Sequence, residues 1–269
     1  MKLSFYGSGR AYGQEKIAIE LRSQGIPIAE KTIKKIMDAE GLVSKYILKR
    51  TSKKTSKTNR DPIENKLDRE FGGYKPKEVI VSDQTYVNVN NNWHYICLII
   101  ELSHREIIGY SAGKHKDAEL VKEALYSIKG NLSKIGTFHT DRAGEFKNDE
   151  IDKILTTFGI ERSLSKAGKP IDNAVAESMY DILKTEFIYD EVFMSLNDLK
   201  LRLGTWIHWY NNKRLHSSLG MISPTKSKSL NTIGVQKREK TDYRNMNKQT
   251  QKHTQVNNTI ISSKINVFN

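Results

Sequence analysis

The stretch VIVSDQTYVNVNNNWHYICLIIEL, residues 79–102, decides the expected fold. Its first half is rich in β-branched and aromatic residues and predicts a strand, which the polar residue Asp83 interrupts. Asn90-Asn91-Asn92 then predicts a turn, and Trp93 to Leu102 predicts a second strand. Two strands joined by a short polar turn indicate an antiparallel hairpin at the start of a sheet.

Downstream, the pattern changes to alternating helices and strands. Residues 107–112 predict a third strand, and apolar residues at helical spacing after Asp117 predict a helix. Thr137-Phe138-His139-Thr140 predicts a short strand that ends at Asp141. The remaining expected elements are helix 149–158, strand 160–164, a helix from the Asp172-Asn173 cap to about Phe187, and helix 196–210.

Three meandering strands followed by helix, strand, helix, strand and helix form a mixed α/β order. This order predicts a five-stranded mixed sheet with helices on both faces. The first and fourth strands are expected to be neighbours, which would place Asp83 and Asp141 opposite each other.

Residues 11–43 predict a separate helical unit. Apolar residues at positions 17, 18 and 21 have helical spacing, Gly25-Ile26-Pro27 breaks the pattern, and Gly41 follows a second helix as a plausible cap. Two short helices around such a turn make a helix-turn-helix candidate, and a hairpin without a DNA role is the alternative. The second helix would carry three lysines that could meet phosphates, Lys31, Lys34 and Lys35.

The distribution of charge indicates a polyanionic partner. The chain of 269 residues is 37% hydrophobic and 28% charged, and its net charge is +13. Seven basic and no acidic residues lie between Ser44 and Arg60, and nine basic and two acidic residues lie from Lys226 to Asn269. We expect phosphate contacts from the first segment, including Lys53 and Lys54, whereas for the second a solvated tail is equally compatible with the composition.

Several protein classes are excluded by composition. A single cysteine, Cys97, rules out a disulfide framework and a cysteine-based zinc site, and its apolar neighbours predict a buried core residue. We see neither a signal peptide nor a run of about 18 apolar residues that could span a membrane. A reducing cytoplasm is the expected compartment.

Three acidic residues occupy positions that suit metal-dependent chemistry. Asp83 interrupts a strand, Asp141 ends another, and Glu177 lies one turn into a helix that can pack beside them. Converging carboxylates repel one another unless cations compensate, and Mg²⁺ prefers such oxygen ligands. Two Mg²⁺ ions could support phosphodiester displacement, with Mn²⁺ as a substitute. Taken singly, each residue is also compatible with a turn, a loop pair or a solvated helix face.

Basic residues near these carboxylates could hold the DNA backbone. Lys184 lies seven positions after Glu177, which places both on one helix face. Lys166 and Lys169 lie in the loop before that helix, and Arg142 follows Asp141 directly. These four residues are candidate phosphate contacts.

At this point the motifs resemble a known family, the retroviral-integrase-type transposases of bacterial insertion sequences. The chain is most similar to the second-frame product of the insertion-sequence-three family. The family's three acidic motifs resemble Val81–Tyr86, His139–Phe146, and Asp172–Ser178 followed by Leu183–Glu186. Its closing motif resembles Tyr210–Gly220 and Ser223–Thr225. Its N-terminal domain resembles Tyr12-Gly13, Gly25-Ile26, Lys31-Thr32 and Gly41-Leu42. Thirty-five residues separate Asp141 from Glu177, which is the spacing of that family.

The resemblance implies a ribonuclease-H-like catalytic core with Asp83, Asp141 and Glu177 as its catalytic and metal-binding residues. It implies cleavage of double-stranded DNA at terminal inverted repeats and transfer of the freed 3′-hydroxyl to target DNA. It further implies a homo-multimer on DNA, association with the nucleoid, and a partner protein from the first reading frame.

The predicted domain limits follow from these patterns. We expect a helix-turn-helix-like domain at 1–43, a basic linker at 44–75, the catalytic core at 76–228 and a disordered basic tail at 229–269.

The sequence departs from the family pattern at Gln84, at Ala143-Gly144 and at Lys169-Pro170-Ile171. None of these departures removes a carboxylate. Two other functions stay open, a decayed transposase that only binds DNA and a nuclease that cuts without joining.

Overall fold

In the computed structural model, β1 (Val79–Val89) is the central strand of a five-stranded sheet with the order β3-β2-β1-β4-β5. The structure describes residues 1–48, 67, 73–165 and 174–232. β2 (Asn92–Glu101) and β3 (Ile107–Gly113) complete an antiparallel meander, whereas β4 (Thr137–Thr140) and β5 (Glu161–Leu164) run parallel to β1. This topology confirms the predicted five-stranded mixed sheet.

Asp83 does not interrupt β1, so the predicted break in this strand is wrong. The ladder between β1 and β2 pairs Asp83 with Leu98 and continues through the following residues to the turn. A strand tolerates a polar residue where its side chain faces a pocket, because the ladder is built by the backbone.

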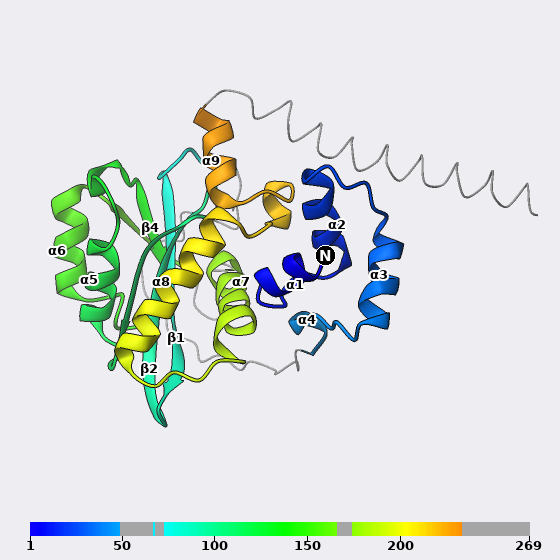
Figure 1. Ribbon diagram of the computed structural model, residues 1–269. Coiled ribbons are helices and arrows are strands. Elements are labelled where there is room, and N and C mark those ends of the chain that lie inside the picture. The colour runs from blue at the N-terminus through cyan, green and yellow to red at the C-terminus, as the bar shows by residue number, and fades with distance from the viewer. Residues whose placement is uncertain (49–66, 68–72, 166–173, 233–269) are drawn as a thin grey trace, which may run out of the picture. The chain divides into compact units, whose positions relative to one another are not determined.

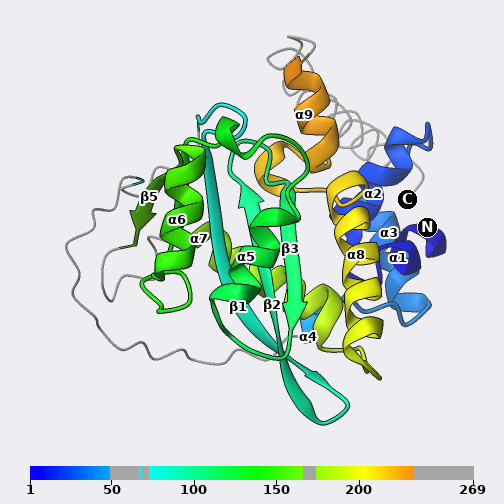
Figure 2. The ribbon, with the colours of Figure 1, turned by 90° about the vertical axis from the view of Figure 1, so that its left-hand side faces the viewer.

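The hairpin between β1 and β2 turns at Asn90 and Asn91, as predicted. Their φ angles are +47° and +63°, a left-handed conformation that asparagine adopts more readily than most residues. The hairpin extends past the end of β3 (Figure 2), so its tip is held by contacts other than that strand.

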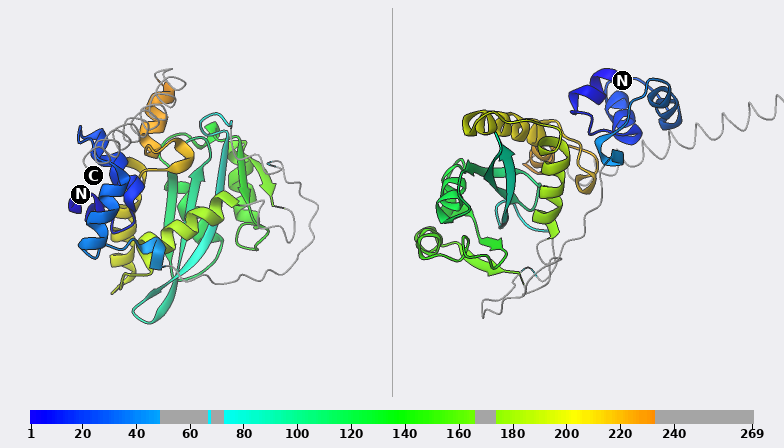
Figure 3. Two further views of the ribbon diagram at one scale, coloured as in Figure 1. Left: turned by 90° about the vertical axis from the view of Figure 1, so that its right-hand side faces the viewer. Right: turned by 90° about the horizontal axis from the view of Figure 1, so that it is seen from below.

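Helices cover both faces of the sheet (Figure 1 and the right view of Figure 3). α5 (Ala118–Tyr126) and α6 (Asp149–Phe158) pack on one face, over a core that includes Ile80, Cys97 and Phe138. α7 (Ala174–Leu183) and α8 (Leu196–Asn212) pack on the other face, over a second core. The sheet is therefore buried on both sides, as the α/β order predicted.

Local signals explain where the helices of the first face begin and how closely they pack. Asp117 caps α5 by accepting a hydrogen bond of 3.0 Å from the Leu120 amide, and Asn148 caps α6 similarly. Gly109 on β3 lets α5 approach the sheet, since a Cβ there would lie 2.5 Å from the carbonyl oxygen of Ala124. The short helix η1 (Leu132–Lys134) leads from α5 towards β4.

The helix predicted to reach Phe187 changes its geometry before that residue. α7 ends at Leu183, and a π-helical turn, η3 (Lys184–Ile188), follows it. The predicted cap at Asp172-Asn173 lies outside the described residues. α8 begins at a serine cap, Ser195, and runs two residues beyond the predicted end at Tyr210.

The chain divides into two compact units, one of residues 49–213 and one that combines residues 1–48 with residues 214–269. In the latter unit, α2 (Gln14–Ser23) and α3 (Glu30–Ala39) confirm the two predicted N-terminal helices. The sequence did not predict α1 (Lys2–Gly7) or α4 (Lys45–Leu48).

Residues after Lys213 pack with these N-terminal helices. The Leu215 amide donates a hydrogen bond of 2.7 Å to the Tyr12 hydroxyl. A short helix, η4 (Ser217–Leu219), is followed by α9 (Pro224–Thr232), which the sequence did not predict because its residues have no amphipathic pattern. α9 reaches into the segment that we expected to be a disordered tail, and the rest of that tail lies outside the described residues. The predicted domain limits stay predictions.

Among the described residues, no helix is both long enough and apolar enough to cross a membrane.

Candidate active site

Asp83 and Asp141 lie level with each other on two neighbouring parallel strands. Val79 pairs with Thr137, an offset of 58 positions (137 − 79), and Asp141 follows Asp83 by the same 58 positions (141 − 83). β4 ends at Thr140 and pairs with β1 only as far as Val81. The two carboxylates therefore stand at the point where β1 and β4 separate, as the predicted strand order required.

The Tyr180 side chain of α7 fixes the backbone of β1 at Asp83. Its hydroxyl donates a short hydrogen bond to the carbonyl oxygen of Asp83 and accepts one of 2.8 Å from the Leu98 amide. Asp83 and Leu98 are partners in the ladder between β1 and β2, so the hydroxyl bridges the two strands at this pair. Burial raises the pKa of the Tyr180 phenol well above its usual range, which keeps the donating proton in place.

The loop after β4 holds the Asp141 carboxylate. Its Oδ1 atom accepts a hydrogen bond of 3.1 Å from the Ala143 amide, and Arg142 Nε donates one of 2.7 Å to the Ser165 carbonyl. Further along the loop, Glu145 forms an ion pair of 2.6 Å with Lys116, which lies between β3 and α5. The loop is thus tied both to the end of β5 and to the segment after β3.

A pocket of about 270 Å³ opens beside Asp83. Glu177 and Lys184 both line it, so the two residues that we expected on one helix face do reach one cavity. Lys184 Nζ also lies 5.3 Å from the centre of the Tyr86 ring. The remaining lining residues are Gln84, Thr85, Tyr86, Tyr95, Lys116 and Tyr180.

Negative charge in this region is poorly compensated. The pKa of Asp83 is raised to about 7, first by burial and then by the nearby charge of Asp141, with a smaller contribution from Glu177. The Gln84 amide, 2.7 Å from the carboxylate, and Lys116 oppose this rise. The Asp83 carboxyl consequently keeps its proton to higher pH than an ordinary aspartate does.

Asp141 has a similar environment. Burial raises its pKa, the charge of Glu145 adds to the rise, and the Ala143 amide and Lys116 oppose it. The charge of Lys116 therefore acts on both aspartates.

In the described ranges, no three side chains of His, Cys, Asp or Glu are grouped closely enough to hold a metal ion. The negative charge of Asp141 raises the pKa of Asp83, so these two carboxylates are close enough to interact. Glu177 of α7 lines the pocket beside Asp83. Holding a shared ion with all three carboxylates requires them to approach more closely than they do in this structure.

The other predicted DNA contacts are not among the residues that line this pocket. Lys31, Lys34 and Lys35 lie exposed on α3, where Lys34 forms an ion pair of 2.9 Å with Asp38. Lys53, Lys54, Lys166 and Lys169 lie outside the described residues. The DNA-binding roles of all these residues, and of Arg142, stay predictions.

Two pocket residues escaped the sequence interpretation. Lys116 lies in an exposed basic loop, which usually indicates solvation, and only the packing of the loop brings it to the aspartates. Tyr180 lies three positions after Glu177, and its apolar neighbours favour a core role. Its position, about one helical turn after Glu177, was the only feature of the sequence that could have indicated a role at the site.

Comparisons with known proteins identify the family of this chain. Residues 73–170 and residues 158–224 match two family models, both described as integrase core domain. The chain is 30% identical over 232 residues to the transposase InsF for insertion sequence IS3A of Escherichia coli K12, which covers 85% of this chain and 80% of that protein. It is 27% identical over 215 residues to the putative transposase InsK for insertion sequence IS150 of the same strain, with 79% and 76% covered.

Among solved structures, the HTLV-2 integrase catalytic core domain in complex with magnesium is similar, with 14% identity and a TM-score of 0.46. That similarity covers 57% of this chain and 97% of the viral domain.

Proposed function

The chain belongs to the insertion-sequence transposases with an integrase core, and we propose that it cuts and joins DNA strands through Asp83, Asp141 and Glu177. It is a polynucleotidyl transferase of the DDE type, and it acts in DNA transposition.

The observation that carries the proposal is the level placement of Asp83 and Asp141 where β1 and β4 separate. Both carboxyl groups have a raised pKa, since both are largely buried and each lies near further negative charge. Perturbed carboxyls in a pocket are more typical of reactive sites than of structural ion pairs. Glu177 lines the pocket beside Asp83 and is the third carboxylate of the proposed set.

The donor set fits a divalent metal. Carboxylate oxygens are the ligands that Mg²⁺ prefers, and a cation would relieve the repulsion that raises the pKa of Asp83. We propose that Asp83, Asp141 and Glu177 would hold one or two Mg²⁺ or Mn²⁺ ions. Such ions supply activation of an attacking oxygen and stabilisation of a leaving one.

Lys116, Lys184 and Tyr180 have supporting roles in this proposal. Asp83 must lose its proton before it can act as a ligand, and Lys116 favours that loss. Lys184 lines the pocket together with Glu177, and we propose that it binds a phosphate oxygen of the strand being cut. Tyr180 positions Asp83 through its backbone.

The partners follow from the same proposal. We propose that the substrates are the terminal inverted repeats of an element and a target duplex, and that the chain assembles as a homo-multimer on them. A first-frame partner protein would supply part of the recognition of the ends.

A plasmid assay tests the assignment of the carboxylates. Purified protein is incubated with supercoiled plasmid and Mg²⁺ or Mn²⁺, and nicking is scored with and without a chelator. Glu177→Gln is expected to lower metal-dependent nicking on the order of a thousandfold while DNA binding is retained. Asp181→Asn, which changes an exposed acidic residue of the same helix, is the matched control and is expected to nick normally.

Nicking that is unchanged in Glu177→Gln would remove Glu177 from the site. Tight binding by the wild type without nicking, even on a substrate that carries a pre-cut element end, would favour a decayed transposase that only binds DNA.

A further inference from the structure

Two large aromatic side chains lie exposed on the β1–β2 hairpin beside the pocket. Tyr86 is 58% exposed and Trp93 is 59% exposed. Their ring centres are 5.1 Å apart and their planes meet at 88°, so the rings contact edge to face. Tyr86 lines the carboxylate pocket, and Trp93 continues the aromatic surface one ring further along the hairpin.

A cation adjoins this aromatic surface. Lys184 Nζ lies 5.3 Å from the centre of the Tyr86 ring and also lines the pocket. The ammonium group, the Tyr86 ring and the Trp93 ring are thus successive neighbours leading from the carboxylates to the hairpin. A positive group followed by two exposed aromatic side chains matches a phosphate followed by a base.

The hairpin that carries Trp93 is held in place. At its tip, the Asn90 amide donates a hydrogen bond of 3.0 Å to the Phe193 carbonyl, and Val89 forms a β-bridge with the same residue. Arg202 of α8 lies over the Phe193 ring, with its guanidinium 4.9 Å from the ring centre.

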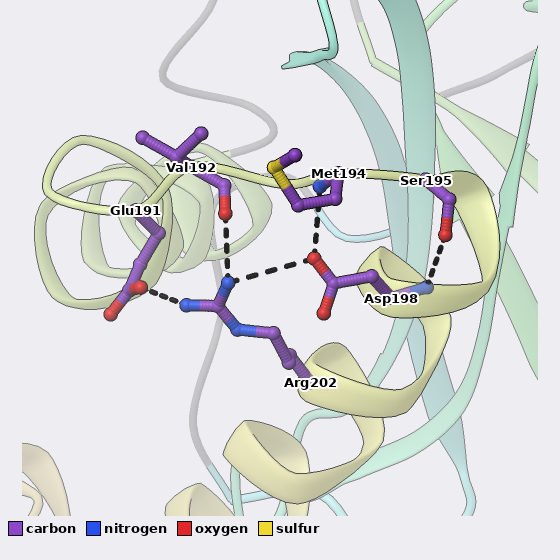
Figure 4. Close-up of polar contacts among 6 residues, drawn as sticks. All are labelled: Glu191, Val192, Met194, Ser195, Asp198 and Arg202. Atoms are coloured by element: carbon purple, nitrogen blue, oxygen red, sulfur yellow. Dashed lines mark hydrogen bonds and ion pairs between the residues drawn. The ribbon is translucent and has the colours of Figure 1, made fainter.

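Arg202 also fixes the segment around Phe193 (Figure 4). It forms ion pairs with Glu191 and, at 3.7 Å, with Asp198, and it donates a hydrogen bond of 2.9 Å to the Val192 carbonyl. Met194 is anchored to the same Asp198 carboxylate by its amide. A surface prepared in this way loses little conformational entropy when a ligand covers it.

We propose that Tyr86 and Trp93 form an aromatic platform in which Trp93 stacks on an unpaired base of the DNA strand that enters the carboxylate pocket, Tyr86 supports Trp93 edge to face, and Lys184 contacts the adjoining phosphate. This proposal rests on the proposed function, because it takes the strand in the pocket to be DNA. The platform would stabilise a locally opened end next to the bond that is cut.

The chemistry of the surface favours an unpaired nucleotide over a base in a duplex. In a duplex, both faces of a base are covered by its neighbours, so a protein ring can stack on it only after the base has left the helix. Stacking on an aromatic ring is tolerant of sequence because every base has a flat face. The platform therefore selects for strand opening rather than for a particular base.

Direct binding measurements test the platform without requiring catalysis. We would measure the affinity of the full chain, in the presence of a chelator, for a blunt duplex and for the same duplex with a short 3′ oligothymidine tail. The wild type is expected to prefer the tailed duplex, and Trp93→Ala is expected to lose about 5- to 100-fold in affinity for it. Trp93→Phe keeps an aromatic ring and is expected to retain most of the preference.

Leu201→Ala is the matched control, because Leu201 is 73% exposed on α8 and lies outside the platform. It is expected to bind both duplexes as the wild type does. A 2-aminopurine base in the tail supplies a second readout, since its fluorescence is quenched when it stacks on Trp93 and is expected to recover in Trp93→Ala.

Equal affinity of Trp93→Ala and wild type for the tailed duplex would overturn the platform. A change of oligomeric state in Trp93→Ala without a change in DNA affinity would also overturn it and would identify a protein interface instead. Loss of tail binding in Trp93→Ala together with absent nicking by the wild type would support the platform while contradicting the proposed catalysis.

Discussion

Asp83 illustrates how one residue links the fold to the chemistry. Its raised pKa means that, in the metal-free protein, the folded state holds a proton that the unfolded chain has already released. A group of this kind makes the free energy of unfolding fall as pH rises from about 4 to about 7. Ionised Asp83 therefore lowers the free energy of unfolding, and a bound cation would offset this loss.

Asp83→Asn is expected to raise the melting temperature of the chelated protein at about pH 8, because the cost of charging a buried carboxyl disappears. The free energy of unfolding is expected to rise by about 1 to 4 kcal/mol at pH 8. Near pH 4 the rise is expected to vanish, because the Asp83 carboxyl of the folded wild type is then neutral, as the asparagine is. Thermal unfolding at the two pH values measures the difference. Glu123→Gln, at an exposed position of α5, is expected to give no such pH-dependent gain, and an equal gain in both variants would contradict the explanation.

Tyr180 is the second residue whose effect can be isolated. Tyr180→Phe removes the hydroxyl that bridges the Asp83 carbonyl and the Leu98 amide, and is expected to lower the free energy of unfolding by about 1 to 3 kcal/mol. It is also expected to shift the Mg²⁺ dependence of nicking to higher concentration, since the backbone of Asp83 loses its support. Urea unfolding and a metal titration of nicking measure the two effects.

The exposed residue Tyr126 provides the control for this substitution. Tyr126→Phe removes a hydroxyl from an exposed position of α5 and is expected to change neither measurement. A Tyr180→Phe protein that is less stable but has an unchanged metal dependence would limit Tyr180 to a structural role.

At the scale of elements, the close packing of α5 on β3 determines how firmly one face of the sheet is covered. Gly109→Ala would place a Cβ 2.5 Å from the Ala124 carbonyl oxygen and 2.7 Å from a side-chain carbon of Ile128. Because backbone cannot yield as a flexible side chain can, we expect a loss of about 1 to 3 kcal/mol in the free energy of unfolding.

Urea unfolding followed by circular dichroism measures this loss. Gly144→Ala is the matched control, because a Cβ at that position meets no atom within 4 Å. Equal stability of the two variants would show that α5 can move away from β3 without penalty.

The π-helical turn is a second feature at this scale. α7 is a regular α-helix from Glu177 to Leu183. The hydrogen-bonding pattern changes to that of a π-helix at Lys184, the residue that lines the pocket. π-Helical turns frequently occur at functional sites. The rest of the turn buries Thr185, Glu186 and Phe187.

At the scale of the whole molecule, the net charge of +13 favours binding to a polyanion such as DNA and makes that binding depend on salt concentration. Each phosphate neutralised by a lysine or arginine contributes about −0.9 to the slope of log affinity against log salt concentration. The segments richest in basic residues, 44–60 and 226–269, lie mostly outside the described residues. Their contribution is therefore best measured in solution.

A chain that ends at Thr232 lacks seven basic and two acidic residues of the tail. It is expected to bind DNA with a shallower salt dependence, by about 0.9 for each phosphate contact that is lost. Fluorescence anisotropy over a range of salt concentrations measures the slopes of the full and shortened chains. Identical slopes would show that the tail does not touch phosphates.

The sequence by itself determined the class of the fold and predicted which strands are neighbours of β1. Alternating apolar residues around Asn90-Asn91 predict the hairpin, and the spacing of strands and helices predicts that β1 and β4 are neighbours, so Asp83 and Asp141 could be paired without coordinates. These features depend on local preferences and on periodic patterns, which neighbouring residues along the chain carry.

Only the tertiary structure decided how the site is completed. Lys116 and Tyr180 lie far from Asp83 along the chain, and the packing of a loop and of α7 brings them to it. The stacking surface likewise requires Tyr86, Trp93 and Lys184 to meet from a hairpin and a helix. Contacts between distant segments depend on how whole elements pack, and no local pattern records that packing.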